Sequence, residues 1–227
     1  MTEIQDKARA IFDEVWAELT ETHGESLPFP KTFIWFGGAP GAGKGTHWKA
    51  VAEHFGITAE PLVASSLLKT PEMKKLIDAG HLVDDKSVTN CLFGAMLRPE
   101  YADGIIIDGF PRTEVQAEVV KLLFAKLSET TTPTFGVMIL TVDEKTSVER
   151  QLGRAKEDAA AGKPVRATDL DPEKTAERYR VFLRDTVGAL KILSQTFPNA
   201  YVDGSGKDKP VVRGEIEAAL AKTFPKQ

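Results

Sequence analysis

Hydrophobic residues follow two kinds of pattern along the chain, one typical of helices and one typical of strands. Residues 3–21 carry apolar side chains at three- and four-residue spacing, which is typical of an amphipathic helix. Short, continuous apolar runs come later, and such runs are typical of buried strands. We expect strands at residues 32–36, 61–63, 104–108, 135–141 and 200–202.

Helical patterns separate these apolar runs. We expect helices at residues 44–54, 71–79, 87–97, 113–127, 143–154, 172–195 and 210–223, the sixth being the longest. The intervening residues 155–171 include a small polar run and are expected to be irregular and mobile. Strands that alternate with helices predict an α/β fold with a parallel, doubly wound sheet, whose ligand sites lie at the carboxyl ends of the strands.

A glycine-rich stretch, residues 37–46, joins the first expected strand to the next helix. Its glycines allow the backbone to curl so that successive N–H groups point inward, as a bound phosphate requires. The helix that follows adds its positive N-terminal end, and Lys44 adds a full charge. The spacing fits the Walker A pattern, except that Gly45 takes the usual Ser/Thr place and Thr46 follows it. We interpret the stretch as a phosphate-binding loop, the alternative being a glycine-rich turn with an incidental lysine.

The strand at residues 104–108 ends in Asp108 and runs into the sequence DGFPRT. A carboxylate at a strand end opposite a phosphate loop is suited to orient Mg²⁺, directly or through water. Arg112 follows four residues later and can reach a second anionic group. The alternative is that Asp108 simply caps the next turn.

The two motifs together closely resemble the adenylate kinase family of nucleoside monophosphate (NMP) kinases. The resemblance covers residues 32–222 and implies a three-layer P-loop kinase fold with a five-stranded parallel sheet, a small helical NMP-binding insertion and a short lid. The single cysteine, Cys91, excludes the zinc-bearing lid of some relatives, so the lid is expected to be zinc-free. The implied segments are a helical extension (1–30), core (31–60), NMP-binding segment (61–97), core (98–153), lid (154–171) and core (172–227).

The resemblance implies transfer of the γ-phosphoryl group of MgATP to a nucleoside monophosphate. Such chemistry needs converging positive charge rather than a nucleophile, because the acceptor is already a phosphate oxygen. The implied catalytic residues are Lys44, Arg112, Arg154, Arg166 and Arg178. The implied ATP-binding residues are Gly38, Ala39, Pro40, Gly41, Ala42, Gly43, Lys44, Gly45, Thr46, Arg150, which would stack on the adenine, and Val202. The implied NMP-binding residues are Ala64, Lys69, Leu82, Val83, Gly109, Arg112 and Gln116, and Asp108 would hold Mg²⁺, through water.

The segment expected to bind the monophosphate departs from the family pattern. Where most relatives read S-T-G-D-x-L-R, residues 63–69 read VASSLLK. Lys69 replaces an arginine that grips the acceptor phosphate, so the charge is kept and the bidentate fork is lost. Ala64 resembles the alanine of pyrimidine-specific members, whereas Gln116 resembles the glutamine that reads adenine. AMP is the favoured acceptor, and the alternatives are a UMP/CMP kinase or a catalytically weakened nucleotide sensor.

Composition limits the partners and the cellular compartment that we expect for the protein. With a net charge of −4, the chain has no overall positive charge that would attract nucleic acid or anionic lipid. No apolar run has membrane-spanning length, the N-terminus is unlike a signal peptide, and one cysteine fits a reducing compartment. We expect a cytoplasmic monomer that binds ATP and a monophosphate, with no nucleic-acid or membrane partner. The N-terminal helix is expected to pack on the core, a partner surface being the alternative, and Cys91 and the four histidines are expected to be structural or surface residues.

Overall fold

Five strands form one parallel sheet in the order β2-β3-β1-β4-β5. The computed structural model describes residues 2–78, 82–163, 165 and 169–225. β1 lies at the centre of the sheet, with β3 on one side and β4 on the other, so the connections lead to strands on both sides of β1. In such sheets a crevice opens where the strand order reverses, here at the carboxyl end of β1. The strands are β1 (Thr32–Gly38), β2 (Leu62–Val63), β3 (Ile105–Asp108), β4 (Thr134–Thr141) and β5 (Asn199–Asp203).

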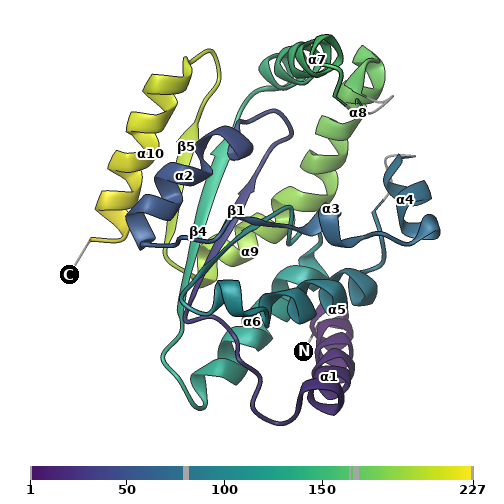
Figure 1. Ribbon diagram of the computed structural model, residues 1–227, viewed down its shortest axis with the longest axis vertical. Helices are drawn as coiled ribbons and strands as arrows, with labels where there is room; N and C mark the ends of the chain where they lie inside the picture. Colours follow the sequence, from purple (N-terminus) through teal and green to yellow (C-terminus); the bar gives the residue numbers. More distant parts are fainter. Residues whose placement is uncertain (1, 79–81, 164, 166–168, 226–227) are drawn as a thin grey trace.

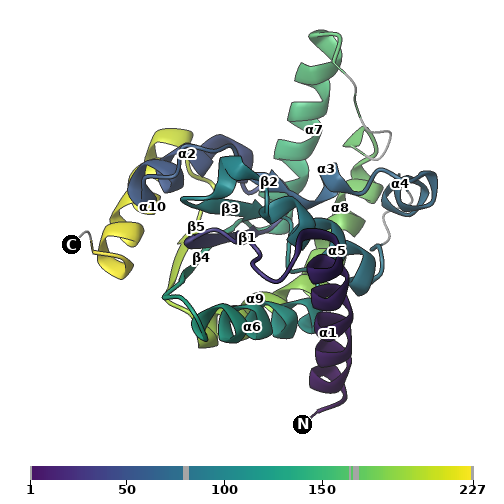
Figure 2. The ribbon, with the colours of Figure 1, turned by 60° about the horizontal axis from the view of Figure 1, so that its bottom comes forward.

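Helices cover both faces of this sheet, as Figures 1 and 2 show. α2 and α10 lie on one face, and α6 and α9 lie on the other, which confirms the expected three-layer α/β fold. The helices are α1 (Glu3–His23), α2 (Lys44–Phe55), α3 (Ala64–Leu67), α4 (Pro71–Asp78), α5 (Asp85–Met96), the 3₁₀ turn η1 (Pro99–Tyr101), α6 (Glu114–Ser128), α7 (Glu144–Ala160), α8 (Pro172–Val181), the π turn η3 (Phe182–Thr186), α9 (Val187–Thr196) and α10 (Lys209–Thr223).

The core is centred on the two middle strands. Phe33, Trp35 and Ile106 are fully buried, since helices cover β1 and β3 from both sides. This double coverage explains why these strands appear in the sequence as continuous apolar runs rather than as alternating ones. The ring of Phe33 lies 4.4 Å from that of Phe135 on β4, which joins the neighbouring strands through their side chains.

Helix α1 packs beside the sheet layers, against α5 and α6 (Figure 2). A capping box between Thr2 and Gln5 fixes its first turn. One face of α1 is buried, including Phe12 and Val15, while Trp16 is partly buried and stacks on Phe12 at 5.5 Å. The predicted packing role of this helix is therefore confirmed.

Several expected elements have different bounds. α7 continues to Ala160, well past the predicted end near Arg154, because the residues 155–160 are mostly strong helix formers. The long helix predicted at 172–195 is interrupted by the π turn η3. α5 starts at Asp85, two residues early, because Asp84 caps it by accepting from the Ser87 amide at 2.9 Å. The short helix α3 was not predicted.

Cys91 is half-buried, and burial raises the pKa of its thiol, so it has the character of a packing residue. Among the described residues, no helix has the length and apolarity needed to cross a membrane.

Candidate active site

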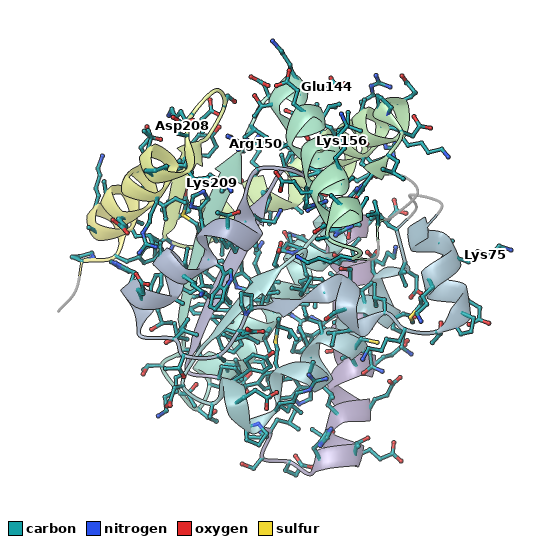
Figure 3. All side chains as sticks on the ribbon, turned by 45° about the horizontal axis from the view of Figure 1, so that its top comes forward. Lys75, Glu144, Arg150, Lys156, Asp208 and Lys209 are labelled. Carbon is teal, nitrogen blue, oxygen red and sulfur yellow. The ribbon has the colours of Figure 1, made fainter. Side chains whose placement is uncertain are left out.

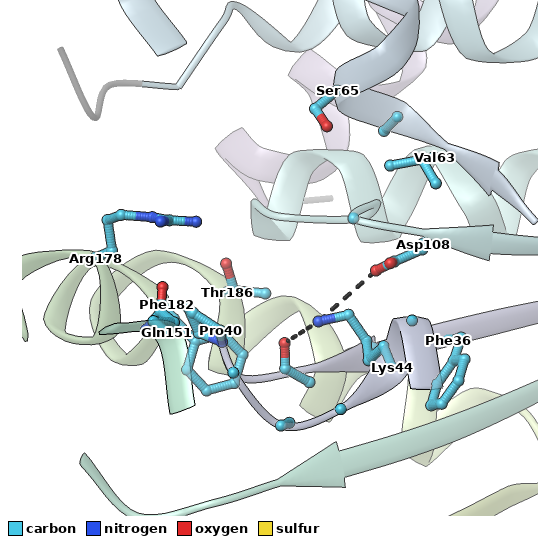
Figure 4. A pocket seen from close by; sticks show the side chains of 18 of the residues that line it. Phe36, Pro40, Lys44, Val63, Ser65, Asp108, Gln151, Arg178, Phe182 and Thr186 are labelled. Atoms are coloured by element: carbon cyan, nitrogen blue, oxygen red, sulfur yellow. Dashed lines mark hydrogen bonds and ion pairs between the residues drawn. The ribbon is translucent and has the colours of Figure 1, made fainter. Parts of the chain in front are cut away.

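A cleft of about 950 Å³ opens at the carboxyl ends of β1 and β3. This volume lies at the upper end of the range for small-molecule sites. The phosphate loop forms its floor, α3 and the start of α6 form one wall, and α7, α8 and η3 form the other (Figure 4). Segments that are far apart in the sequence therefore meet at the sheet edge that the strand pattern predicts.

Glycines are required at two points of the phosphate loop. Gly38 has a φ of +142°, and a Cβ there would lie 1.9 Å from the carbonyl oxygen of Leu140 on β4. Gly43 has a φ of +102° and is the N-cap residue of α2, its carbonyl accepting from the amides of Thr46 and His47 at 2.9 and 3.0 Å. A side chain at either position would force the loop away from its curled path. The geometry agrees with the predicted loop, since the N-terminus of α2 faces the cleft.

Lys44 lies across the loop (Figure 4). Its Nζ donates to the carbonyls of Gly38 at 3.0 Å and Ala39 at 3.3 Å, and it lies 3.7 Å from Oδ1 of Asp108. Burial lowers the pKa of Lys44, and the neighbouring Asp108 carboxylate opposes that shift. The ammonium and the carboxylate predicted from the two motifs are thus brought together at the centre of the cleft.

Helix α7 holds the loop from the other side through two buried residues. The Ser147 hydroxyl donates to the Pro40 carbonyl at 2.8 Å, and Gln151 Nε2 donates to the Ser147 hydroxyl at 3.1 Å. Gln151 lines the cleft, and its Oε1 has no partner among the described residues. Neither residue could be singled out from the sequence, because two polar residues four apart on a helix are more typical of a solvent-facing surface.

Arg150 connects the same helix to two separate loops. Its guanidinium donates to the carbonyls of Gly204 and Lys207, each at 2.9 Å, and to that of Ala42 at 3.4 Å. Figure 3 shows Arg150 on α7 near the start of α10, where Asp208 and Lys209 lie. Arg150 was predicted for the ATP site and does line the cleft, whereas Val202 is buried in β5 and is not among the described lining residues.

His47 is a cleft residue that the sequence did not single out. Its side chain is buried on α2 and lines the cleft. Burial lowers the pKa of His47, and the charges of Arg150, Arg213 and Lys209 lower it further. The imidazole is consequently neutral near pH 7. Of the other histidines, His23 is exposed, His54 lies 2.8 Å from the carbonyl of Phe224, and His81 lies outside the described residues.

Two of the predicted arginines meet at one carboxylate. Arg154 on α7 and Arg178 on α8 both pair with Asp169, which is buried, and both line the cleft. This cluster places two cations at the wall opposite Asp108. The predicted Arg166 lies outside the described residues.

The other wall contains a network around Gln116. Gln116 is buried at the start of α6, where its Oε1 accepts from the Arg112 amide at 2.7 Å and its Nε2 donates to Oδ1 of Asp85 at 3.1 Å. The Arg112 side chain donates through Nε to the Gly109 carbonyl at 3.0 Å. Asp85 was not predicted, since an acidic residue in the first turn of a helix is ordinary and gives no separate signal.

The remaining predicted acceptor residues differ in their placement. Ala64, Leu82, Val83 and Gly109 line the cleft. Lys69 is exposed and does not belong to the described lining. Ala39 in the phosphate loop is also buried away from the cleft surface, where it contributes a carbonyl to Lys44 rather than a lining atom.

Comparison with known proteins agrees with this geometry. A family model described as adenylate kinase matches residues 36–197. The chain is 36% identical to an adenylate kinase from Chelativorans sp. (strain BNC1) over 192 residues, which cover 82% of this chain and 96% of the relative. It is 34% identical to an adenylate kinase from Sinorhizobium medicae (strain WSM419), over 82% of this chain and 98% of the relative. The chain therefore belongs to the adenylate kinase family and is a nucleoside monophosphate kinase, a phosphotransferase.

Proposed function

We propose that the protein transfers the γ-phosphoryl group of MgATP to AMP and produces two molecules of ADP. The observation that carries the proposal is the convergence of two walls on Lys44. Lys44, the phosphate loop and Arg150 line the same cleft as Arg112 and Gln116, and Asp108 lies 3.7 Å from Nζ of Lys44. A cleft that aligns two polyanions and neutralises the charge between them supplies what phosphoryl transfer requires.

Each cation has a role in this scheme. Lys44 contacts the β- and γ-phosphates from within the loop, and Arg112 contacts the acceptor phosphate. Arg154 and Arg178 neutralise the charge that spreads over the transferred group. In support, both arginines line the cleft: Arg154 lies on α7, whose last residues belong to the segment 154–171 proposed as the lid, and Arg178 lies on α8, which begins directly after that segment. Closure of that segment would exclude water and so prevent hydrolysis of ATP.

The residues beside Lys44 fit a magnesium ion. Mg²⁺ keeps several of its waters and binds through one or two carboxylates together with substrate phosphates. Asp108 provides such a carboxylate, partly exposed to the cleft and next to the loop. Asp108 would hold the ion through water, with the Thr46 hydroxyl nearby. The ion offsets phosphate charge, while positioning of the nucleotides falls to the loop amides, Lys44 and the arginines.

Gln116 supports AMP as the acceptor. Its contacts with Arg112 and Asp85 use one lone pair of Oε1 and one proton of Nε2, which leaves an acceptor and a donor side by side for a base. The N1 atom and the amino group of adenine complement that pair. UMP or CMP is the second candidate acceptor, favoured by Ala64, whose small side chain lines the cleft near Gly109.

The test is an acceptor screen. ADP formation is measured with ATP and each of AMP, UMP, CMP and GMP, and AMP is expected to give the highest kcat/KM. A higher value for UMP or CMP would replace the proposed acceptor. Binding of a dinucleotide that joins ATP and AMP, without turnover of any monophosphate, would instead indicate a nucleotide sensor.

A further inference from the structure

The N-terminal helix α1 is connected through an ion pair to the acceptor wall, the side of the cleft formed by α3 and the start of α6. Lys7 on α1 donates from Nζ to Oδ2 of Asp85 at 3.1 Å. The other oxygen of this carboxylate, Oδ1, accepts from the hydroxyl of Thr113 at 2.7 Å and from Nε2 of Gln116 at 3.1 Å. Three elements that are separated in sequence, α1, α5 and α6, thus meet at one carboxylate that lies directly behind the cleft.

The network fixes which end of the Gln116 amide faces which neighbour. An ionised carboxylate only accepts hydrogen bonds, and a backbone N–H only donates them. Nε2 must therefore face Asp85, and Oε1 must face the Arg112 amide. Rotation of the amide by 180° would place oxygen against oxygen and N–H against N–H. The remaining donor and acceptor of Gln116 consequently reach the cleft in one fixed order.

Lys7 sustains this order by balancing the charge of Asp85. The Asp85 side chain is only 10% exposed, whereas that of Lys7 is 60% exposed. Without Lys7, Oδ2 of this nearly buried carboxylate loses its charged partner, which is costly. The carboxylate can then turn its oxygens towards other donors, so removal of Lys7 weakens the constraint that Oδ1 places on Gln116.

We infer that Lys7 is a positioning residue for the acceptor base, acting through Asp85 to hold the Gln116 amide in one orientation. The inference rests on the proposed role of Gln116 at the acceptor base. Lys7 lies before the region matched by the family model, which starts at residue 36. The positioning of Gln116 therefore depends on α1, a helix outside that region. The helix thereby acquires a part in acceptor choice beyond its packing on the core.

Lys7→Met tests the inference, with Lys86→Met as its matched control. The side chain of Lys86 also joins α5 to α1, through Glu14 at 2.7 Å and Glu18 at 3.1 Å. Among the described contacts it has no hydrogen bond or ion pair with the Asp85 side chain, and it does not belong to the described cleft lining. For Lys7→Met we expect a rise of about two- to five-fold in the KM for AMP, because the lysine is largely exposed. The preference for AMP over UMP and CMP should fall by a similar factor, with the KM for ATP unchanged.

The control decides between positioning and packing. Lys86→Met should leave both KM values and the preference at wild-type levels, and Lys7→Arg should restore them. Equal effects of Lys7→Met and Lys86→Met on the KM for AMP would overturn the inference, as would an equal rise in the KM for ATP. So would unchanged kinetics in Lys7→Met accompanied by a lowered Tm.

A spectroscopic measurement separates failure of this inference from failure of the proposed function. In ¹⁵N-labelled protein, the side-chain amide signals of Gln116 are assigned by their loss in Gln116→Met. They should shift in Lys7→Met and remain in place in Lys86→Met, whether or not AMP is the acceptor. Unshifted signals in Lys7→Met would overturn the inference even in an enzyme that uses AMP, and a shift in a protein inactive towards AMP would overturn only the proposed function.

Discussion

The phosphate loop and the acceptor wall around Gln116 are built in different ways. At the loop, side chains hold backbone carbonyls, with Lys44 on Gly38 and Ala39, and Ser147 on Pro40. At the acceptor wall, side chains hold one another through the Asp85 carboxylate. The first arrangement depends on backbone shape, which a short glycine motif specifies. The second depends on residues that only the folded chain brings together, so it can diverge without changing the loop.

Lys44→Met should produce the largest effect, because it removes the charge shared by the loop and the acceptor wall. We expect kcat to fall by about 10²- to 10³-fold, since a fixed cation beside the developing charge is lost. Lys49→Met, a change in the same helix outside the cleft, serves as the control in the same coupled assay. Retention of full activity by Lys44→Met would contradict the proposed mechanism.

Gln116→Met tests whether the acceptor wall acts independently of the phosphate loop, because the substitution keeps the buried volume and removes only the amide. The kcat/KM for AMP should fall by about 10- to 100-fold, as the base and Asp85 each lose a hydrogen-bonding partner. The KM for ATP should stay within about two-fold of wild type if the loop and the acceptor wall act separately. An equal loss for every monophosphate would show that Gln116 does not read the base.

Lys69→Arg asks whether the exposed lysine belongs to the acceptor wall. An arginine restores a planar fork that can hold a phosphate through two hydrogen bonds. We therefore expect the KM for AMP to fall by about five-fold while the KM for ATP stays constant. No change in either constant would place residue 69 outside the substrate contacts, in agreement with its absence from the described lining.

Ser147→Ala should act on the phosphate loop alone. Loss of the hydrogen bond to Pro40 removes about 1 kcal/mol of support for the loop, which corresponds to a rise of about five-fold in the KM for ATP. Ser128→Ala removes a comparable bond, to Phe124 at 2.7 Å at the C-terminal end of α6 and outside the described cleft lining, and should change neither KM. A parallel rise in the KM for AMP would indicate that the loop and the acceptor wall move together.

The smallest effect concerns His47 and pH. Since burial and nearby cations lower the pKa of His47 in the folded protein, the folded state binds fewer protons here than the unfolded state. Stability from this site is thus present above the unfolded pKa of about 6.5 and is lost as the pH falls towards the folded pKa. Between pH 7.5 and 5.5, His47→Gln should lose less unfolding free energy than wild type in urea titrations. His23→Gln, at an exposed position, should keep the wild-type slope.

The contrast between the phosphate loop and the acceptor wall also explains which features could be predicted from the sequence. The order of strands and helices, the loop and Asp108 follow from local patterns, because hydrophobic period and glycine spacing act within about ten residues. The π turn and the contacts of Asp85 could not be predicted, since they depend on packing between distant segments. Arg154 and Arg178 were identified through family resemblance, but their common partner became visible only in the folded chain.

Asp169 competes with anionic ligands for Arg154 and Arg178. A ligand that carries one negative charge gains little by drawing Arg154 and Arg178 away from this carboxylate, because it exchanges one ion pair for another. A nucleotide with several phosphate charges gains more contacts than it displaces. We therefore expect polyphosphate ligands to bind at these two arginines in preference to inorganic phosphate and other small anions.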